Sequence, residues 1–219
     1  MGFGGRRVLR TLEEKLDPRW SALLAIDVQN DYIHPEGASG RRGGDVQSAV
    51  EMMPRLIKLV DAARTAGVRV IYTRNWHGPA TDSEPWLERS TRGTGDQANR
   101  AGLAGSWGAE WYEIQPAEGE HVINKFRYDA FLGTNLEYYL RAHGIRTVVC
   151  CGTATNVCVE STIRAAHMRD HYVVLASDCC AAPDPELHRA TLRNVERHFG
   201  TLATLSEIEA CWAAVSPRL

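Results

Sequence analysis

The sequence lacks the features that would tie the protein to a membrane, an export route or a nucleic acid. No stretch approaches the roughly 18 apolar residues of a membrane-spanning helix, and the first 20 residues contain no apolar run of signal-peptide length. The formal net charge is -2 at pH 7, and no block of like charges suggests a phosphate backbone or a membrane surface as partner. We therefore expect a cytoplasmic protein that binds neither a membrane nor a nucleic acid.

The cysteines also lack a recognisable framework. Six of them occur as two adjacent pairs and two single residues, without a C-x-x-C motif or the spacing of a secreted disulfide scaffold. Internal repeats and low-complexity segments are missing as well. A chain of 219 residues with 44% hydrophobic content is long enough for one substantial core. We expect an N-terminal arm at 1–20 and a single domain at 21–219.

What the sequence does contain is a regular alternation of strand and helix patterns. Short apolar runs rich in β-branched residues predict buried parallel strands, at 22–27, 69–74, 121–125, 147–152, 172–177 and 202–206. Helical patterns lie between them, one ending at Gly67 and others at 134–143, 157–169, 184–198 and 206–215. The alternation predicts an α/β fold, a Rossmann-like three-layer α/β/α sandwich with a central six-stranded parallel sheet and right-handed crossovers.

One segment breaks the alternation. Residues 75–119 contain glycine, proline, tryptophan and charged residues without lasting periodicity. Loops of this length in a compact domain are usually functional or mobile. The segment either covers a ligand site or serves contacts between subunits.

Three chemically useful side chains follow predicted strands. Asp27 and Lys125 end the first and third strands, and Cys158 follows the fourth strand and a short loop. Ligands of such sheets bind beyond the carboxyl ends of the strands, so the three side chains are expected to meet there. A helix N-terminus and a nearby ammonium lower the pKa of a thiol, which would make Cys158 a thiolate nucleophile. Singly, each residue also has an ordinary explanation: a turn residue, a solvated strand end and a small buried hydrophobe.

Three motifs resemble the isochorismatase-like cysteine hydrolases, a family that includes nicotinamidases and the amidohydrolases of N-carbamoylsarcosine, ureidoacrylate and biuret. They are AIDVQNDY at 25–32, KFRYDAFLGTNLEYYL at 125–140 and GTATNVCVEST at 152–162, and the similarity extends over 21–208. The resemblance implies an Asp-Lys-Cys triad at Asp27, Lys125 and Cys158. It also implies a cis peptide bond between Thr153 and Ala154, with the amides of Ala154 and Cys158 forming an oxyanion hole.

The resemblance suggests a branch of the family as well. Nicotinamidases use an Asp-x-His pair for a metal ion after the second strand, where this chain has Asn75 and His77. An amide in place of the carboxylate is a poor ligand for a divalent cation, so we expect no metal and no cofactor. Asn75 either hydrogen-bonds a ureido substrate or caps a turn.

The motif KFRYDAF is closest to the ureidoacrylate, biuret and triuret hydrolases. Tyr128 is a candidate for a hydroxyl near the substrate, and Trp107 either walls the pocket or packs within the loop. Arg127 either binds a substrate carboxylate or pairs with Asp129 at the surface.

The sequence therefore predicts a metal-independent cysteine amidohydrolase that cleaves a C–N bond of a small carbamoyl, ureido or amide compound through a thioester, releasing ammonia or an amine. We expect a homo-oligomer, either a dimer or a tetramer. Three alternatives remain: a nicotinamidase-type amidase, an isochorismatase-type vinyl-ether hydrolase, and an inactive interaction module of the same fold. The intact triad argues against the last two.

Overall fold

The centre of the molecule is a parallel sheet of six strands. The computed structural model describes residues 4, 7–92 and 100–214. The strands are β1 (Ser21–Ile26), β2 (Arg69–Asn75), β3 (His121–Lys125), β4 (Thr147–Thr153), β5 (Tyr172–Ala181) and β6 (Thr201–Ala203), in the order β3-β2-β1-β4-β5-β6. Every neighbouring pair is parallel. The predicted fold class is confirmed.

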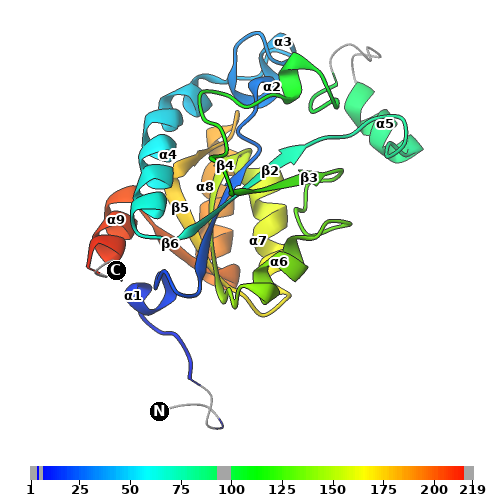
Figure 1. Cartoon of the computed structure of the whole chain (residues 1–219). Helices are drawn as coiled ribbons and strands as arrows, with labels where there is room; N and C mark the ends of the chain where they lie inside the picture. Colours follow the sequence, from blue (N-terminus) through cyan, green and yellow to red (C-terminus); the bar gives the residue numbers. More distant parts are fainter. Residues whose placement is uncertain (1–3, 5–6, 93–99, 215–219) are drawn as a thin grey trace.

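Helices cover both faces of this sheet and complete three layers (Figure 1). The α-helices are α1 (Leu12–Lys15), α2 (Asn30–Ile33), α3 (Ala38–Arg41), α4 (Gln47–Thr65), α5 (Glu84–Thr91), α6 (Leu136–Ala142), α7 (Glu160–His167), α8 (Pro185–Asn194) and α9 (Leu205–Ala213). Shorter turns are η3 (Trp107–Ala109), η4 (Thr155–Val159) and η5 (Val195–Phe199). Helices α4 and α9 pack together on one face, with α7 and α8 on the other.

The strand composition explains the core. Strands β1 and β4 are buried along their whole length, as expected for strands covered by helices on both faces. Burial of each Val, Leu or Ile side chain contributes roughly 1.5–3 kcal/mol to folding. Helix α4 adds the buried side chains of Met52, Met53, Leu56, Leu59 and Val60.

Most predicted boundaries lie within a few residues of the observed ones, and the last strand shows why some do not. A strand was predicted at 202–206, but β6 ends at Ala203. The Thr204 hydroxyl accepts a hydrogen bond from the amide of Glu207, and the Glu207 carboxylate accepts from the amide of Thr204. This capping box starts α9 and ends the strand.

The described part of the N-terminal arm packs on the domain. Leu9 and Leu16 are buried, and the Trp212 indole of α9 donates to the Leu16 carbonyl at 3.0 Å. The Leu9 amide donates to the Tyr172 hydroxyl of β5 at 3.0 Å. The arm therefore covers the amino-terminal end of the sheet.

The segment predicted as irregular, 75–119, contains two helical elements. Residues 76–83 lead from β2 into α5, residues 93–99 lie outside the described part of the chain, and η3 follows near the end. Figure 1 places α5 at the same end of the sheet as α2 and α3. Among the described helices, none is long and apolar enough to cross a membrane.

Candidate active site

The site begins where β1 ends at the centre of the sheet. The strand order reverses between β1 and β4, and such a reversal leaves a crevice at the carboxyl ends of the strands. Asp27 follows β1 with φ 52°, a left-handed conformation that aspartate tolerates better than most residues. Its amide donates to the Thr73 carbonyl at 2.9 Å, and the Thr153 hydroxyl donates to its carbonyl at 2.9 Å. Both neighbouring strands therefore fix the position of Asp27.

The three residues predicted as a triad lie in contact. Lys125 Nζ is 2.7 Å from Asp27 Oδ2, and both side chains are 0% exposed. The same ammonium lies 3.5 Å from Cys158 Sγ, and the thiol is hydrogen-bonded to the Asp27 carboxylate. The structure thus brings an acid, a base and a thiol from three strand ends into one cluster.

Asn75, the last residue of β2, connects the members of this cluster. Its Oδ1 accepts a hydrogen bond from Lys125 Nζ at 3.0 Å. Its Nδ2 donates to Asp27 Oδ2 at 3.0 Å and to the Tyr32 hydroxyl at 2.7 Å. Asn75 lines the pocket described below, but its amide is already engaged. Both Nδ2 hydrogens are therefore used, and a substrate can bond this amide only at the remaining lone pair of Oδ1 unless one of these contacts is given up.

Burial governs the charges of the ion pair. It raises the pKa of Asp27, although the nearby Lys125 ammonium acts in the opposite direction. Burial alone would lower the pKa of Lys125, but the Asp27 carboxylate and the Cys158 sulfur outweigh it and the pKa is raised. The lysine therefore stays charged, and the buried carboxylate is a stronger base than an aspartate in water.

The ionisation predicted for Cys158 is corrected by the same argument. Burial and, after it, the negative charge of the Asp27 carboxylate raise the pKa of this thiol to about 12, against the opposing effect of Lys125. The prediction of a thiolate rested on the helix terminus and the Lys125 ammonium, and did not include the desolvation of the buried sulfur. At rest, Cys158 is a neutral thiol hydrogen-bonded to a buried base.

The turn that carries Cys158 depends on a glycine. Gly152 has φ 115°, and a Cβ atom there would collide with the Ile26 carbonyl of β1. Only glycine lets β4 approach β1 this closely. The Thr153–Ala154 peptide bond is cis, as the family resemblance implied. Cys158 then lies in η4, the turn that leads into α7.

A pocket of about 260 Å³ opens onto Cys158. Tyr128 lines it, with its ring 5.1 Å from that of Trp86. Trp107 does not line it: of its two alternatives, a wall of the pocket or packing within the loop, the structure shows packing, because this side chain is 50% exposed and its ring packs edge-on against His34. Trp86 is the aromatic wall instead.

Tyr32 is a second lining residue that the sequence reading did not single out. Its hydroxyl accepts a hydrogen bond from Asn75, and its own hydrogen has no acceptor among the described residues. Burial raises the pKa of this hydroxyl well above the ordinary value, so it keeps its proton. The position follows Asp27 by five residues, and an aromatic residue there was the available signal.

The segment that covers the site is tied to the loop after β1. Gln29 Nε2 donates to the carbonyls of Asn75 and Ala109 at 3.0 and 2.8 Å. Asp31 is buried and accepts from the amide of Gly102 at 2.8 Å. Gly108 lies so close to the Asp31 carboxylate that a Cβ atom would collide with it. These contacts make the described part of the cover from Ala101 onward a fixed wall.

His77, the candidate for a metal ligand after β2, has other partners. Its Nε2 lies 2.6 Å from the Ala101 carbonyl, and its Nδ1 lies 3.0 Å from the Asp82 carboxylate. Arg100 also contacts Asp82. Burial lowers the pKa of His77. In the part of the chain that the structure describes, no group of three or more His, Cys, Asp or Glu residues is arranged to hold a metal ion.

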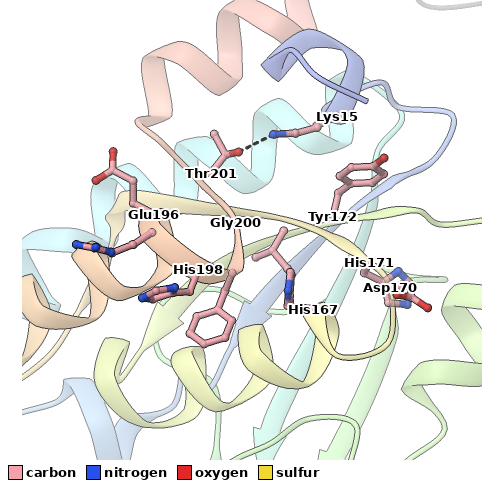
Figure 2. Close-up of a pocket in the computed structure, with 12 residues that line it drawn as sticks. Lys15, His167, Asp170, His171, Tyr172, Glu196, His198, Gly200 and Thr201 are labelled. Carbon is pink, nitrogen blue, oxygen red and sulfur yellow. Dashed lines mark hydrogen bonds between the residues drawn. The ribbon is translucent and has the colours of Figure 1, made fainter. Parts of the chain in front are cut away.

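A larger pocket, of about 450 Å³, lies at the opposite end of the sheet. Figure 2 shows it at the start of β5 and β6, with His167, His171 and His198 around it and Lys15 bonded to Thr201 at 2.7 Å. Its charged groups have both signs, and it contains neither a thiol nor a buried ion pair. The smaller pocket is the candidate active site because it contains the reactive cluster and lies at the carboxyl ends of the strands.

Comparison with known proteins gives consistent matches. The sequence profile described as the isochorismatase domain matches residues 21–207. Ureidoacrylate amidohydrolase RutB of Methylobacterium radiotolerans is 37% identical over 207 residues, which are 89% of this chain and 80% of that protein. A cysteine hydrolase from Pseudomonas syringae pv. phaseolicola superposes with a TM-score of 0.81 at 27% identity, over 96% of this chain and 99% of that one. N-carbamoylsarcosine amidase from Thermoplasma acidophilum gives a TM-score of 0.70 at 28% identity, over 86% and 98%.

Proposed function

The chain belongs to the isochorismatase family, and from that premise we propose that it is a metal-independent cysteine amidohydrolase acting on a small ureido or carbamoyl compound. Its amidohydrolase relatives make it an enzyme that hydrolyses C–N bonds. The observation that carries the finer proposal is the buried contact among Asp27, Lys125 and Cys158 at the base of a pocket.

Catalysis in this proposal starts from the neutral thiol. Asp27 takes the proton of Cys158 as the sulfur attacks the substrate carbonyl, so thiolate character develops only during the attack. The tetrahedral oxyanion is held by the backbone amides of Ala154 and Cys158, two residues that line the pocket. Lys125 stays charged and keeps the carboxylate in place.

The second half of the cycle uses the same carboxyl group. Protonated Asp27 gives its proton to the leaving nitrogen, the C–N bond breaks and ammonia or an amine departs, leaving a thioester on Cys158. Asp27, again a carboxylate, takes a proton from water as the water oxygen attacks the thioester. The C–S bond breaks, the thiol recovers the proton and the acid product leaves.

The shape and lining of the pocket support a small planar substrate. Trp86 and Tyr128 supply aromatic walls, and the Tyr32 hydroxyl supplies a donor beside the cluster. A ureido group offers carbonyl acceptors and N–H donors that such polar partners can satisfy. The match to ureidoacrylate amidohydrolases points to the same substrate class.

Metal independence rests on the chemistry of the residues present. Asn75 stands where the metal-binding pattern needs a carboxylate, and its amide already binds Asp27, Lys125 and Tyr32. Both ring nitrogens of His77 are engaged as well. Homo-oligomerisation, as a dimer or a tetramer, remains a prediction that light scattering on the purified protein can measure.

Ammonia release from a panel of small amides tests the proposal. We expect hydrolysis of ureidoacrylate, biuret or N-carbamoylsarcosine to exceed that of nicotinamide by at least about 100-fold in kcat/KM, since nicotinamide leaves buried polar groups unpaired. Cys158→Ser should abolish the release without changing the Tm. Turnover of nicotinamide at a comparable rate would move the protein to the nicotinamidases.

A further inference from the structure

The pocket above Cys158 carries two arginines. Arg42, which caps α3, and Arg89, on α5, both line it. The guanidinium carbon of Arg89 lies 5.0 Å from the centre of the Tyr128 ring and 5.6 Å from that of Trp86. Such stacking holds a guanidinium by its face and leaves its N–H edge available for hydrogen bonds. The positive charge of Arg89 is therefore held against the aromatic wall of the pocket.

The other arginine beside this wall has a different role. The Arg127 guanidinium donates to the carbonyls of Thr81 and Phe126 at 3.1 and 2.7 Å and to the Ser83 hydroxyl at 3.3 Å. It thereby ties β3 to the start of α5, and the carboxylate-binding role considered for it from the sequence is not supported. Among the described residues, Arg89 has no carboxylate or carbonyl partner that would occupy its N–H edge in the same way.

The other titratable side chains that line the pocket have partners of their own or are uncharged. The charge of Lys125 is matched by Asp27. Burial lowers the pKa of His77, which favours its uncharged form. Among the described lining residues Asp184 is the one acidic side chain, and its Oδ1 accepts from the amides of Glu186 and Leu187 as the N-cap of α8. The lining as a whole favours an anionic ligand.

We propose that Arg89 is a specificity-determining residue that binds a carboxylate of the substrate, remote from the carbonyl that Cys158 attacks. The planar N–H edge of a guanidinium matches the two oxygens of a carboxylate. The preferred substrates are then ureido or carbamoyl carboxylic acids, and neutral ureas of the same size are poor ones. This inference rests on the function proposed for the pocket and narrows its substrate class.

Ligand binding to an inactive enzyme tests the inference separately from turnover. In a Cys158→Ser background, calorimetry would compare 3-ureidopropionate with 3-ureidopropionamide, a neutral ligand of nearly the same shape. Arg89→Gln should weaken binding of the acid about tenfold, equivalent to about 1.4 kcal/mol, and leave binding of the amide unchanged. Arg89→Lys should restore part of the loss. Arg193→Gln, which removes an exposed charge of α8 outside the pocket, should change neither.

Steady-state kinetics with Cys158 intact gives a second readout. Arg89→Gln should raise KM for the acid and leave kcat nearly unchanged, as expected for a group that binds the ground and transition states equally. Equal weakening of acid and amide, or no binding of the acid while Arg89 is intact, would overturn the inference. Failure of the proposed function would give a different result. The Cys158→Ser variant would still bind the acid selectively, but the unaltered enzyme would release no ammonia from it.

Discussion

Removal of the Lys125 ammonium is the perturbation for which the structure sets the clearest expectation. Its 2.7 Å contact with Asp27 corresponds to an attraction of about 6 kcal/mol at an effective dielectric constant of about 20. Desolvation of two fully buried ions consumes much of this gain. The pair contributes little net stability, but either ion alone is costly because its charge remains buried without a partner.

The expected result is therefore strongly non-additive. Lys125→Met and Asp27→Asn should each lower the free energy of unfolding by about 3 kcal/mol, whereas the double variant should lose no more than about 2 kcal/mol. Both single variants should also lose nearly all activity, because both groups act on the same proton transfers. Urea denaturation monitored by circular dichroism measures the stabilities. Lys58→Met, an exposed lysine on α4, should change stability by less than about 0.5 kcal/mol.

The pH dependence of the Lys125→Met variant provides an internal check. Burial raises the pKa of Asp27, and Lys125 is the main opposing influence, so its loss raises that pKa further. A carboxyl group with a raised folded-state pKa binds more protons in the folded state, and stability then falls as pH rises. The loss in free energy of unfolding caused by Lys125→Met, relative to the unaltered protein, should be smaller at pH 5 than at pH 8. The reasoning would be refuted if the stability losses of Lys125→Met and Asp27→Asn added to within about 0.5 kcal/mol in the double variant. It would also be refuted if the stability loss of Lys125→Met did not change with pH.

Three further outcomes can be measured. Ultraviolet difference spectra between the unaltered enzyme and Cys158→Ser should show no thiolate from this residue below about pH 10, because burial raises its pKa to about 12; a thiolate visible at pH 8 would contradict this. Trp86→Ala should raise KM about tenfold, whereas Trp107→Ala should leave the kinetics unchanged, and the reverse order would mean that Trp107 rather than Trp86 walls the pocket. Extensive EDTA treatment should leave activity intact, and activity restored specifically by zinc or iron would disprove metal independence.

The reactive cluster could be predicted because it depends on rules that act at strand ends. Buried parallel strands are visible as apolar runs, and their carboxyl ends meet at one edge of the sheet. Lys125 ends such a run, and Asp27 and Cys158 lie at or shortly after the end of two others, so their meeting requires only the strand order. The family motifs then distinguished this cluster from three unrelated polar residues.

The aromatic wall could not be predicted in the same way. Trp86 and Trp107 both lie in the long segment after β2, where no hydrophobic periodicity and no strand end determines which way a side chain points. Trp86 faces the pocket because α5 packs it against Tyr128 and Arg127. Trp107 turns outward because its carbonyl accepts from Asn30 and its ring packs on His34. These are tertiary contacts that local sequence does not encode.

The ionisation of Cys158 shows how a correct placement can still yield a wrong charge. The helix terminus and the Lys125 ammonium were both expected from the sequence, and both favour a thiolate. The sequence does not show that the thiol is only 4% exposed or that the Asp27 carboxylate is its hydrogen-bond partner. Desolvation and the negative charge raise the pKa more than the ammonium lowers it.

This reversal of charge has a chemical consequence for the resting enzyme. Oxidation of a cysteine requires thiolate character and exposure, and Cys158 has little of either before a substrate arrives. The same burial that keeps the thiol neutral makes Asp27 a stronger base. In the mechanism proposed above, proton transfer between them is therefore coupled to attack on a bound carbonyl, where the proposed oxyanion amides stabilise the charge that forms. On this proposal, a single physical cause, the removal of water from the ends of the strands, both protects the nucleophile and prepares its activation.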